Sequence, residues 1–132
     1  MNPIRACIAF ALLCLSFGAC AMDLGFDRLE KSLRLRPDQK EQFDSAVGAT
    51  QRALLGVALT GMQVKERIEQ EMRKPRPDLG AIARAQEDVV DQLRPLFREA
   101  RDEWMKLYAV LDDDQASIAK DFVQDRLGRL LK

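Results

Sequence analysis

The sequence predicts an all-α protein: a long antiparallel helical hairpin with short flanking N- and C-terminal helices. Apolar or small residues recur at alternating steps of three and four across residues 37–72 and again across residues 79–111, which is the spacing of one helix face. The two stretches have similar lengths and are joined by a short link that contains prolines, so we expect them to fold back on each other. No segment shows the alternation of a strand.

The first 21 residues are expected to form a secretory signal peptide. Arg5 is followed by an apolar run over residues 8–17 and then by small residues that end at Ala21. Cleavage before Met22 would leave residues 22–132 as one helical domain, soluble in the periplasm. The alternative is a lipoprotein anchored through Cys20, because the residues before it are similar to a lipoprotein signal.

Each helix expected in the mature chain has its own apolar pattern. The short first helix carries Phe26, Leu29 and Leu33. The first long helix is predicted to bury a stripe of Phe43, Val47, Thr50, Leu54, Val57, Gly61, Val64, Ile68 and Met72. The second long helix is predicted to bury Leu79, Ile82, Gln86, Val89, Leu93, Leu96, Ala100, Trp104, Leu107 and Leu111. The last helix carries Ile118, Phe122, Leu127, Leu130 and Leu131.

Composition excludes several classes of function. The chain has no His, and its three cysteines all lie within residues 1–21, so a chain cut before Met22 lacks the usual general base, the thiol nucleophile and most transition-metal ligands. The 21 basic residues are balanced by 21 acidic ones, which argues against a nucleic-acid partner. We therefore expect no enzymatic activity, no cofactor and no metal site.

A five-residue pattern opens both the first long helix and the last helix. Residues 35–39 read Leu-Arg-Pro-Asp-Gln and residues 111–115 read Leu-Asp-Asp-Asp-Gln, so both have the form Leu-x-x-Asp-Gln. Each pattern suits a helix start, because leucine buries the incoming chain and the acidic residue lies beside the exposed N–H groups of the first turn.

In this setting the two patterns resemble the boxes of the Spy/CpxP family of periplasmic proteins, which is named for Leu-Thr-x-x-Gln. The matching residues are Leu35, Gln39, Leu111 and Gln115, which we interpret as structural. Neither box has the threonine: Arg36 and Asp112 stand in its place, and aspartate can cap a helix whereas arginine cannot.

The resemblance implies a curved helical hairpin, usually a homodimer, that binds unfolded or envelope proteins without ATP under envelope stress. Two alternatives within the family stay open: an adaptor that restrains an envelope-stress sensor kinase by binding its periplasmic domain, and a metal-responsive periplasmic sensor. The absence of His counts against the last of these.

One side of the predicted hairpin is apolar, aromatic and rich in arginine, and we interpret it as the client-binding face. Its predicted members are Arg52, Leu55, Leu59, Met62, Val90, Arg94, Phe97, Arg101, Met105 and Tyr108. The other side is predicted to be small and partly acidic, with Ala46, Ala49, Ala53, Gly56, Thr60, Ala81, Ala85, Asp88, Glu99 and Glu103. The client-binding interpretation competes with ordinary packing in a monomer or dimer core, which stripes at helical spacing usually serve.

Overall fold

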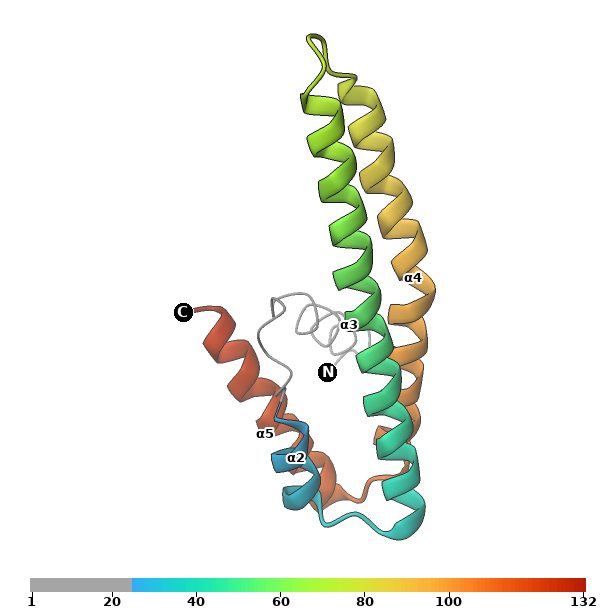
Figure 1. Cartoon of the computed structure of the whole chain (residues 1–132). Coiled ribbons are helices and arrows are strands. Elements are labelled where there is room, and N and C mark those ends of the chain that lie inside the picture. The colour runs from blue at the N-terminus through green and yellow to red at the C-terminus, as the bar shows by residue number, and fades with distance from the viewer. Residues whose placement is uncertain (1–24) are drawn as a thin grey trace.

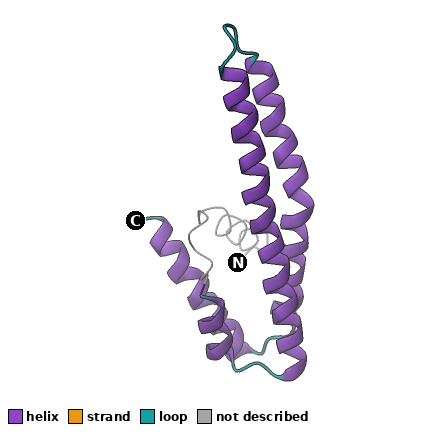
Figure 2. Ribbon diagram, in the orientation of Figure 1, coloured by secondary structure: helices purple, strands orange, loops and turns teal. Residues whose placement is uncertain are grey.

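The computed structural model describes residues 25–132, and the expected signal peptide and Cys20 lie outside the described residues. The described chain consists of four helices and no strand, which confirms the all-α class (Figures 1 and 2). The helices are α2 (Phe26–Leu33), α3 (Pro37–Met72), α4 (Leu79–Val110) and α5 (Asp113–Leu130). Within residues 25–132, no helix is both long enough and apolar enough to cross a bilayer.

The two long helices, α3 and α4, lie side by side and run in opposite directions (Figure 1). The turn between them contains Pro75 and Pro77, and Asp78 ends the turn by accepting a 3.0 Å hydrogen bond from the backbone N–H of Ala81. Helix α4 continues without a break through Pro95. The helix boundaries therefore follow the proline and capping signals of the sequence.

The buried side of α3 is broader than the predicted stripe. Phe43 and Thr50 are buried as the sequence predicts, at 2% and 0% exposed. Ala46, Ala49 and Ala53 are almost completely buried, although the sequence analysis placed them on the outer, small-residue side. A Cβ atom added at Gly56 would come within 2.6 Å of a Leu96 methyl carbon, so this glycine lies directly against α4. Small residues let two helices approach closely, and this contact turns the small stripe inward. The prediction that Ala46, Ala49 and Ala53 lie on an exposed side of α3 is therefore wrong.

The ends of the two predicted stripes, next to the turn, are exposed and not buried. Met72 and Leu79, the residues at which they end, are 57% and 68% exposed. Gln86, placed in the stripe of α4, is exposed as well, and Ala85 beside it is buried. The packed part of the α3–α4 pair is thus concentrated away from the turn.

The hydrophobic core lies at the opposite end of the α3–α4 pair, where α2 and the start of α5 cover it. Its buried members are Leu29, Leu33, Phe43, Ala46, Trp104 and Leu107, with Phe26, Leu35, Val47, Leu111, Ile118 and Phe122 packed around them. The indole of Trp104 contacts the ring of Phe43 edge-on, with centroids 5.7 Å apart, and the ring of Phe26 at 5.3 Å. This base, as we call it, joins all four described helices.

Candidate functional site: a glutamine junction and exposed arms

The two Leu-x-x-Asp-Gln patterns meet at the base through their glutamines. The Nε2 of Gln39 donates to the Oε1 of Gln115 at 2.9 Å, and the Nε2 of Gln115 donates back to the Oε1 of Gln39 at 3.0 Å. Gln39 is 0% exposed and Gln115 is 6% exposed. Two patterns 76 positions apart in the chain thus form a single buried junction.

Every remaining hydrogen-bonding group of the two amides bonds to the backbone. Each Oε1 also accepts from the backbone N–H three residues earlier, that of Arg36 or Asp112, at 3.0 Å. The second N–H of Gln39 donates to the carbonyl of Val110 at 2.7 Å, and that of Gln115 donates to the carbonyl of Leu33 at 3.0 Å. The junction therefore ties the end of α2 and the end of α4 to the starts of α3 and α5.

The two helix starts differ in their capping. Asp112 accepts a 2.8 Å hydrogen bond from the backbone N–H of Gln115, which completes a reciprocal capping box. Arg36 has no acceptor in its side chain, so α3 keeps only the half of the box in which Gln39 accepts. Pro37 follows at the first helical position, where its missing N–H costs nothing.

A second polar contact crosses the core between α3 and α4. The indole Nε1–H of Trp104 donates to the Oγ1 of Thr50 at 2.7 Å, and the Thr50 hydroxyl donates in turn to the carbonyl of Ala46 at 2.8 Å. Thr50 is 0% exposed and Trp104 is 8% exposed, so this hydrogen bond joins two buried polar groups. The contact sets the register of α3 against α4.

Charged groups reinforce the base at its edges. The Nε2 of Gln42 and the Nζ of Lys106 both donate to the Glu103 carboxylate at 2.9 Å, and the Lys106 hydrogen bond, followed by that of Gln42, lowers the pKa of Glu103. Lys40 lies between Asp44 and Glu30, with Nζ–O distances of 2.6 and 2.7 Å, and its hydrogen bonds to them raise its pKa. These contacts link α3 to α4 and α2 to α3.

The structure leaves most of the predicted client-binding residues at the surface. The exposed members are Arg52, Leu55, Leu59, Met62, Val90, Arg94, Arg101, Met105 and Tyr108, while Phe97 is half-buried. Met62 is the most exposed of the apolar ones, at 69%. Leu55, Leu59, Met62 and Val90 lie on the part of α3 and α4 between the base and the turn, which we call the arms, and none of them belongs to the core.

These residues form two rows and not one face. Leu55 and Met62 follow Ala53 by two and nine residues, which places them about 200° and 180° round α3 from the contact with α4. On α4, Phe97 and Arg101 follow the buried Leu93 by four and eight residues, about 40° and 80° round the helix, and so flank that contact. We call Leu55, Leu59 and Met62 the α3 row, and Val90, Arg94, Phe97, Arg101 and Tyr108 the α4 row.

The contact made by Arg52 shows that the two sides of the α3–α4 pair were assigned wrongly. Its guanidinium donates to the Glu99 carboxylate at 2.8 Å, although the sequence analysis placed the two residues on opposite sides. The two other arginines of the set also meet carboxylates of their own helix: Arg94 lies 3.4 Å from Asp91 and Arg101 lies 2.8 Å from Asp102. Such exposed pairs are weak, so the guanidinium groups stay available to a partner.

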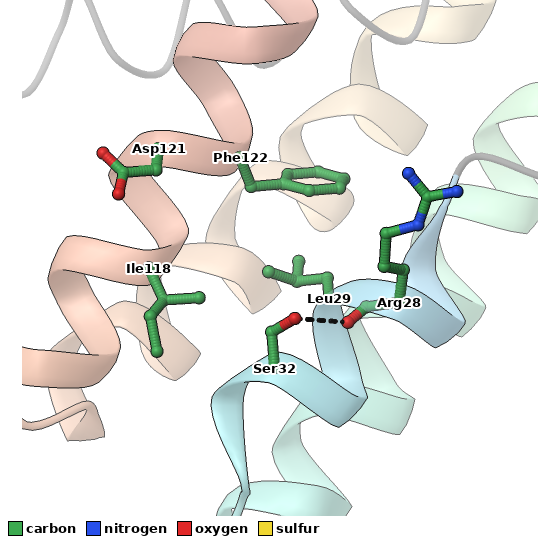
Figure 3. A pocket seen from close by; sticks show the side chains of 6 residues that line it. All are labelled: Arg28, Leu29, Ser32, Ile118, Asp121 and Phe122. Atoms are coloured by element: carbon green, nitrogen blue, oxygen red, sulfur yellow. Dashed lines mark hydrogen bonds between the residues drawn. The ribbon is translucent and has the colours of Figure 1, made fainter.

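A shallow pocket lies between α2 and α5, a region that the sequence analysis did not single out (Figure 3). Its volume is about 380 Å³, and Leu29, Ile118 and Phe122 supply its apolar wall. Arg28 and Asp121 lie at its polar edge, and the Ser32 hydroxyl donates to the carbonyl of Arg28 at 2.9 Å. The chemistry of this lining suits an apolar side chain of a partner better than a reacting group.

Residues 25–132 contain no group of three or more His, Cys, Asp or Glu side chains placed to hold a metal ion. Comparison with family models, with curated proteins and with solved structures finds no match for the chain. The functional argument therefore depends on the geometry of the described residues.

Proposed function

We propose that the protein is an ATP-independent periplasmic chaperone of the Spy/CpxP type, which holds unfolded envelope proteins during stress. The observation that carries this proposal is the exposure of the α3 row. Residues 53–64 contain no charged side chain, yet Leu55, Leu59 and Met62 are each more than half exposed. The outward side of this uncharged stretch is apolar and exposed in the described chain, and such a surface is of the kind that binds other apolar segments.

The two rows supply complementary contacts for a client. Burying one exposed leucine or methionine side chain completely is worth about 1.5–3 kcal/mol, so partial burial of the α3 row by a mobile client gives weak and reversible binding. Methionine adapts to clients of different shape, and the arginines of the α4 row can bond to client carbonyls and carboxylates. Weak contacts of this kind need no nucleotide for release.

The proposed architecture is an antiparallel helical hairpin formed by α3 and α4, with two copies forming a homodimer. The junction of Gln39 and Gln115 supports the hairpin part of this proposal, because it ties the ends of α2 and α4 to the starts of α3 and α5. Light scattering coupled to size exclusion tests the dimer: a monomer mass over the working concentration range would contradict it.

The test of the chaperone proposal is the aggregation of a chemically unfolded client, followed by light scattering without nucleotide. We expect the purified protein to suppress aggregation of several unrelated clients. The triple variant Leu55→Ser/Leu59→Ser/Met62→Ser should lose most of this effect, and Phe97→Ala/Arg101→Ala should weaken it, while both keep their helix content by circular dichroism.

The matched control replaces three exposed polar residues of the same arms: Gln63→Ser, Gln70→Ser and Gln86→Ser. It should suppress aggregation as the unmodified protein does. A folded protein that suppresses nothing would contradict the chaperone proposal and favour a single dedicated partner, such as the periplasmic domain of a sensor kinase. Equal activity of the control and the α3-row variant would show that the row is not the binding surface.

A further inference from the structure

The turn between α3 and α4 is the tip of the described chain, at the end farthest from α2 and α5 (Figure 1). We define the tip surface as Met72, Arg73, Lys74, Arg76 and Leu79. Met72 and Leu79 are among the most exposed large apolar residues of the described chain, and the three cations beside them are exposed as well. The client-binding proposal does not use any of these residues.

The acidic side chains of the tip are already engaged within it. The Glu71 carboxylate accepts a 2.8 Å hydrogen bond from the backbone N–H of Asp78 and another, also 2.8 Å, from the Nζ of Lys74. The Glu71 side chain is only 14% exposed, and these two bonds, that of Lys74 first, lower its pKa. Asp78 caps α4 and lies 3.8 Å from Arg84. The turn is thus held in shape by its own carboxylates.

The positive charge of the tip stays available to a partner. Among residues 25–132, no carboxylate lies within ion-pair distance of Arg73 or Arg76. Over residues 71–79 the chain carries three cations and two carboxylates, and Lys74 is paired with Glu71, so Arg73 and Arg76 are the cations left for a partner. Exposed apolar side chains beside two unpaired arginines match an anionic lipid surface, where the cations meet the headgroups and the apolar groups enter the acyl boundary.

From this geometry we infer that the tip surface docks the protein on an anionic membrane. The small area of the tip supports a membrane over a folded protein partner. A stable protein interface covers about 800 Å² on each side, and the tip is a single turn between two helices. A bilayer instead needs only a few inserted side chains and headgroup contacts. The inference does not depend on the chaperone proposal, because the tip and the α3 row are different surfaces.

The test is flotation of the purified full protein with vesicles of phosphatidylglycerol and phosphatidylethanolamine, and in parallel with vesicles of phosphatidylcholine alone. We expect binding to the anionic vesicles that weakens as salt is raised, and none to the neutral ones. Arg73→Glu/Arg76→Glu should weaken binding at least about 30-fold, from about fivefold for each cation removed. Met72→Ser/Leu79→Ser should weaken it at least about 10-fold, which corresponds to the burial of about one such side chain.

The matched control is Lys31→Glu/Lys120→Glu, which changes the net charge by the same amount on α2 and α5. It should bind anionic vesicles within about fivefold of the unmodified protein, and so should the α3-row triple variant. Arg73→Gln/Arg76→Gln serves if the glutamates disturb the end of α3, as circular dichroism would show.

Absence of binding to anionic vesicles would overturn the inference. So would equal binding to both kinds of vesicle, or an equal loss in the tip and control charge variants. Loss of vesicle binding in the α3-row variant with full binding by the tip variants would also overturn it, because the membrane contact would then be made by the arms. Loss of client holding with intact vesicle binding would affect the chaperone proposal alone.

Discussion

Replacing Gln39 by leucine tests the junction at the base most directly. The change removes four hydrogen bonds: the two exchanged with Gln115, the one from the Arg36 N–H and the one to the Val110 carbonyl. One N–H of the buried Gln115 amide and the backbone N–H of Arg36 then lack their partners. At about 1–2 kcal/mol for each stranded donor, the free energy of unfolding should fall by about 3 kcal/mol.

The measurement is urea unfolding followed by circular dichroism at 222 nm. With a slope of about 2 kcal/mol per molar urea, the midpoint should move down by about 1.5 M. The control Gln86→Leu changes an exposed glutamine of α4 and should stay within about 0.5 kcal/mol of the unmodified protein.

A double-mutant cycle separates the glutamine pair from its surroundings. Gln115→Leu alone should cost about as much as Gln39→Leu, because its hydrogen bonds mirror those of Gln39. In Gln39→Leu/Gln115→Leu neither amide remains to be stranded, so the double variant should be more stable than the sum of the singles predicts by about 2 kcal/mol. Additive costs, or single costs below about 1 kcal/mol, would refute the view that the two amides act as one buried unit.

Three further predictions concern packing and pH. Gly56→Ile should destabilise the protein by more than about 2 kcal/mol in the same urea assay, because even a Cβ atom at this position meets the Leu96 methyl. Gly61 has open space around it, so Gly61→Ala should stabilise the protein by about 0.5–1 kcal/mol. Similar effects at both glycines would contradict the close α3–α4 contact. Trp104→Phe should lower the free energy of unfolding by about 1–2 kcal/mol, through loss of the hydrogen bond to Thr50 and of packing. Adding Thr50→Val to Trp104→Phe should lower it little further. Fully additive losses would show that the hydrogen bond contributes nothing. The pKa of Glu103 is lower in the folded protein than its unfolded value of 4.5, so the carboxylate stabilises the fold above that pH and loses this effect as the pH falls through the folded pKa. The difference in the free energy of unfolding between the unmodified protein and Glu103→Gln should therefore shrink from pH 6 to pH 3. An unchanged difference would contradict this linkage.

The helices, and the residues at which they begin and end, can be predicted from local features of the sequence. The prolines, Asp78 and the two Leu-x-x-Asp-Gln patterns act within a few residues of their own position, so their effect on the backbone can be predicted locally. The exposure of Leu55 and Met62 agrees with the surface assignment for the same reason: both lie well outside either possible buried stripe of α3.

How broad the buried side of α3 is, and which partners the two glutamines bond, depend on the packing of the helices. The stripe through Ala46, Ala49 and Ala53 and the predicted stripe through Phe43 and Thr50 have the same period, so spacing alone does not show that residues of both are buried. The close approach of α4 at Gly56 also buries the small side chains. Likewise, each glutamine reads in the sequence as part of its own helix start, because a partner 76 positions away leaves no local signal. Contacts between distant parts of a chain depend on how the helices pack, and that packing exists only in the folded protein.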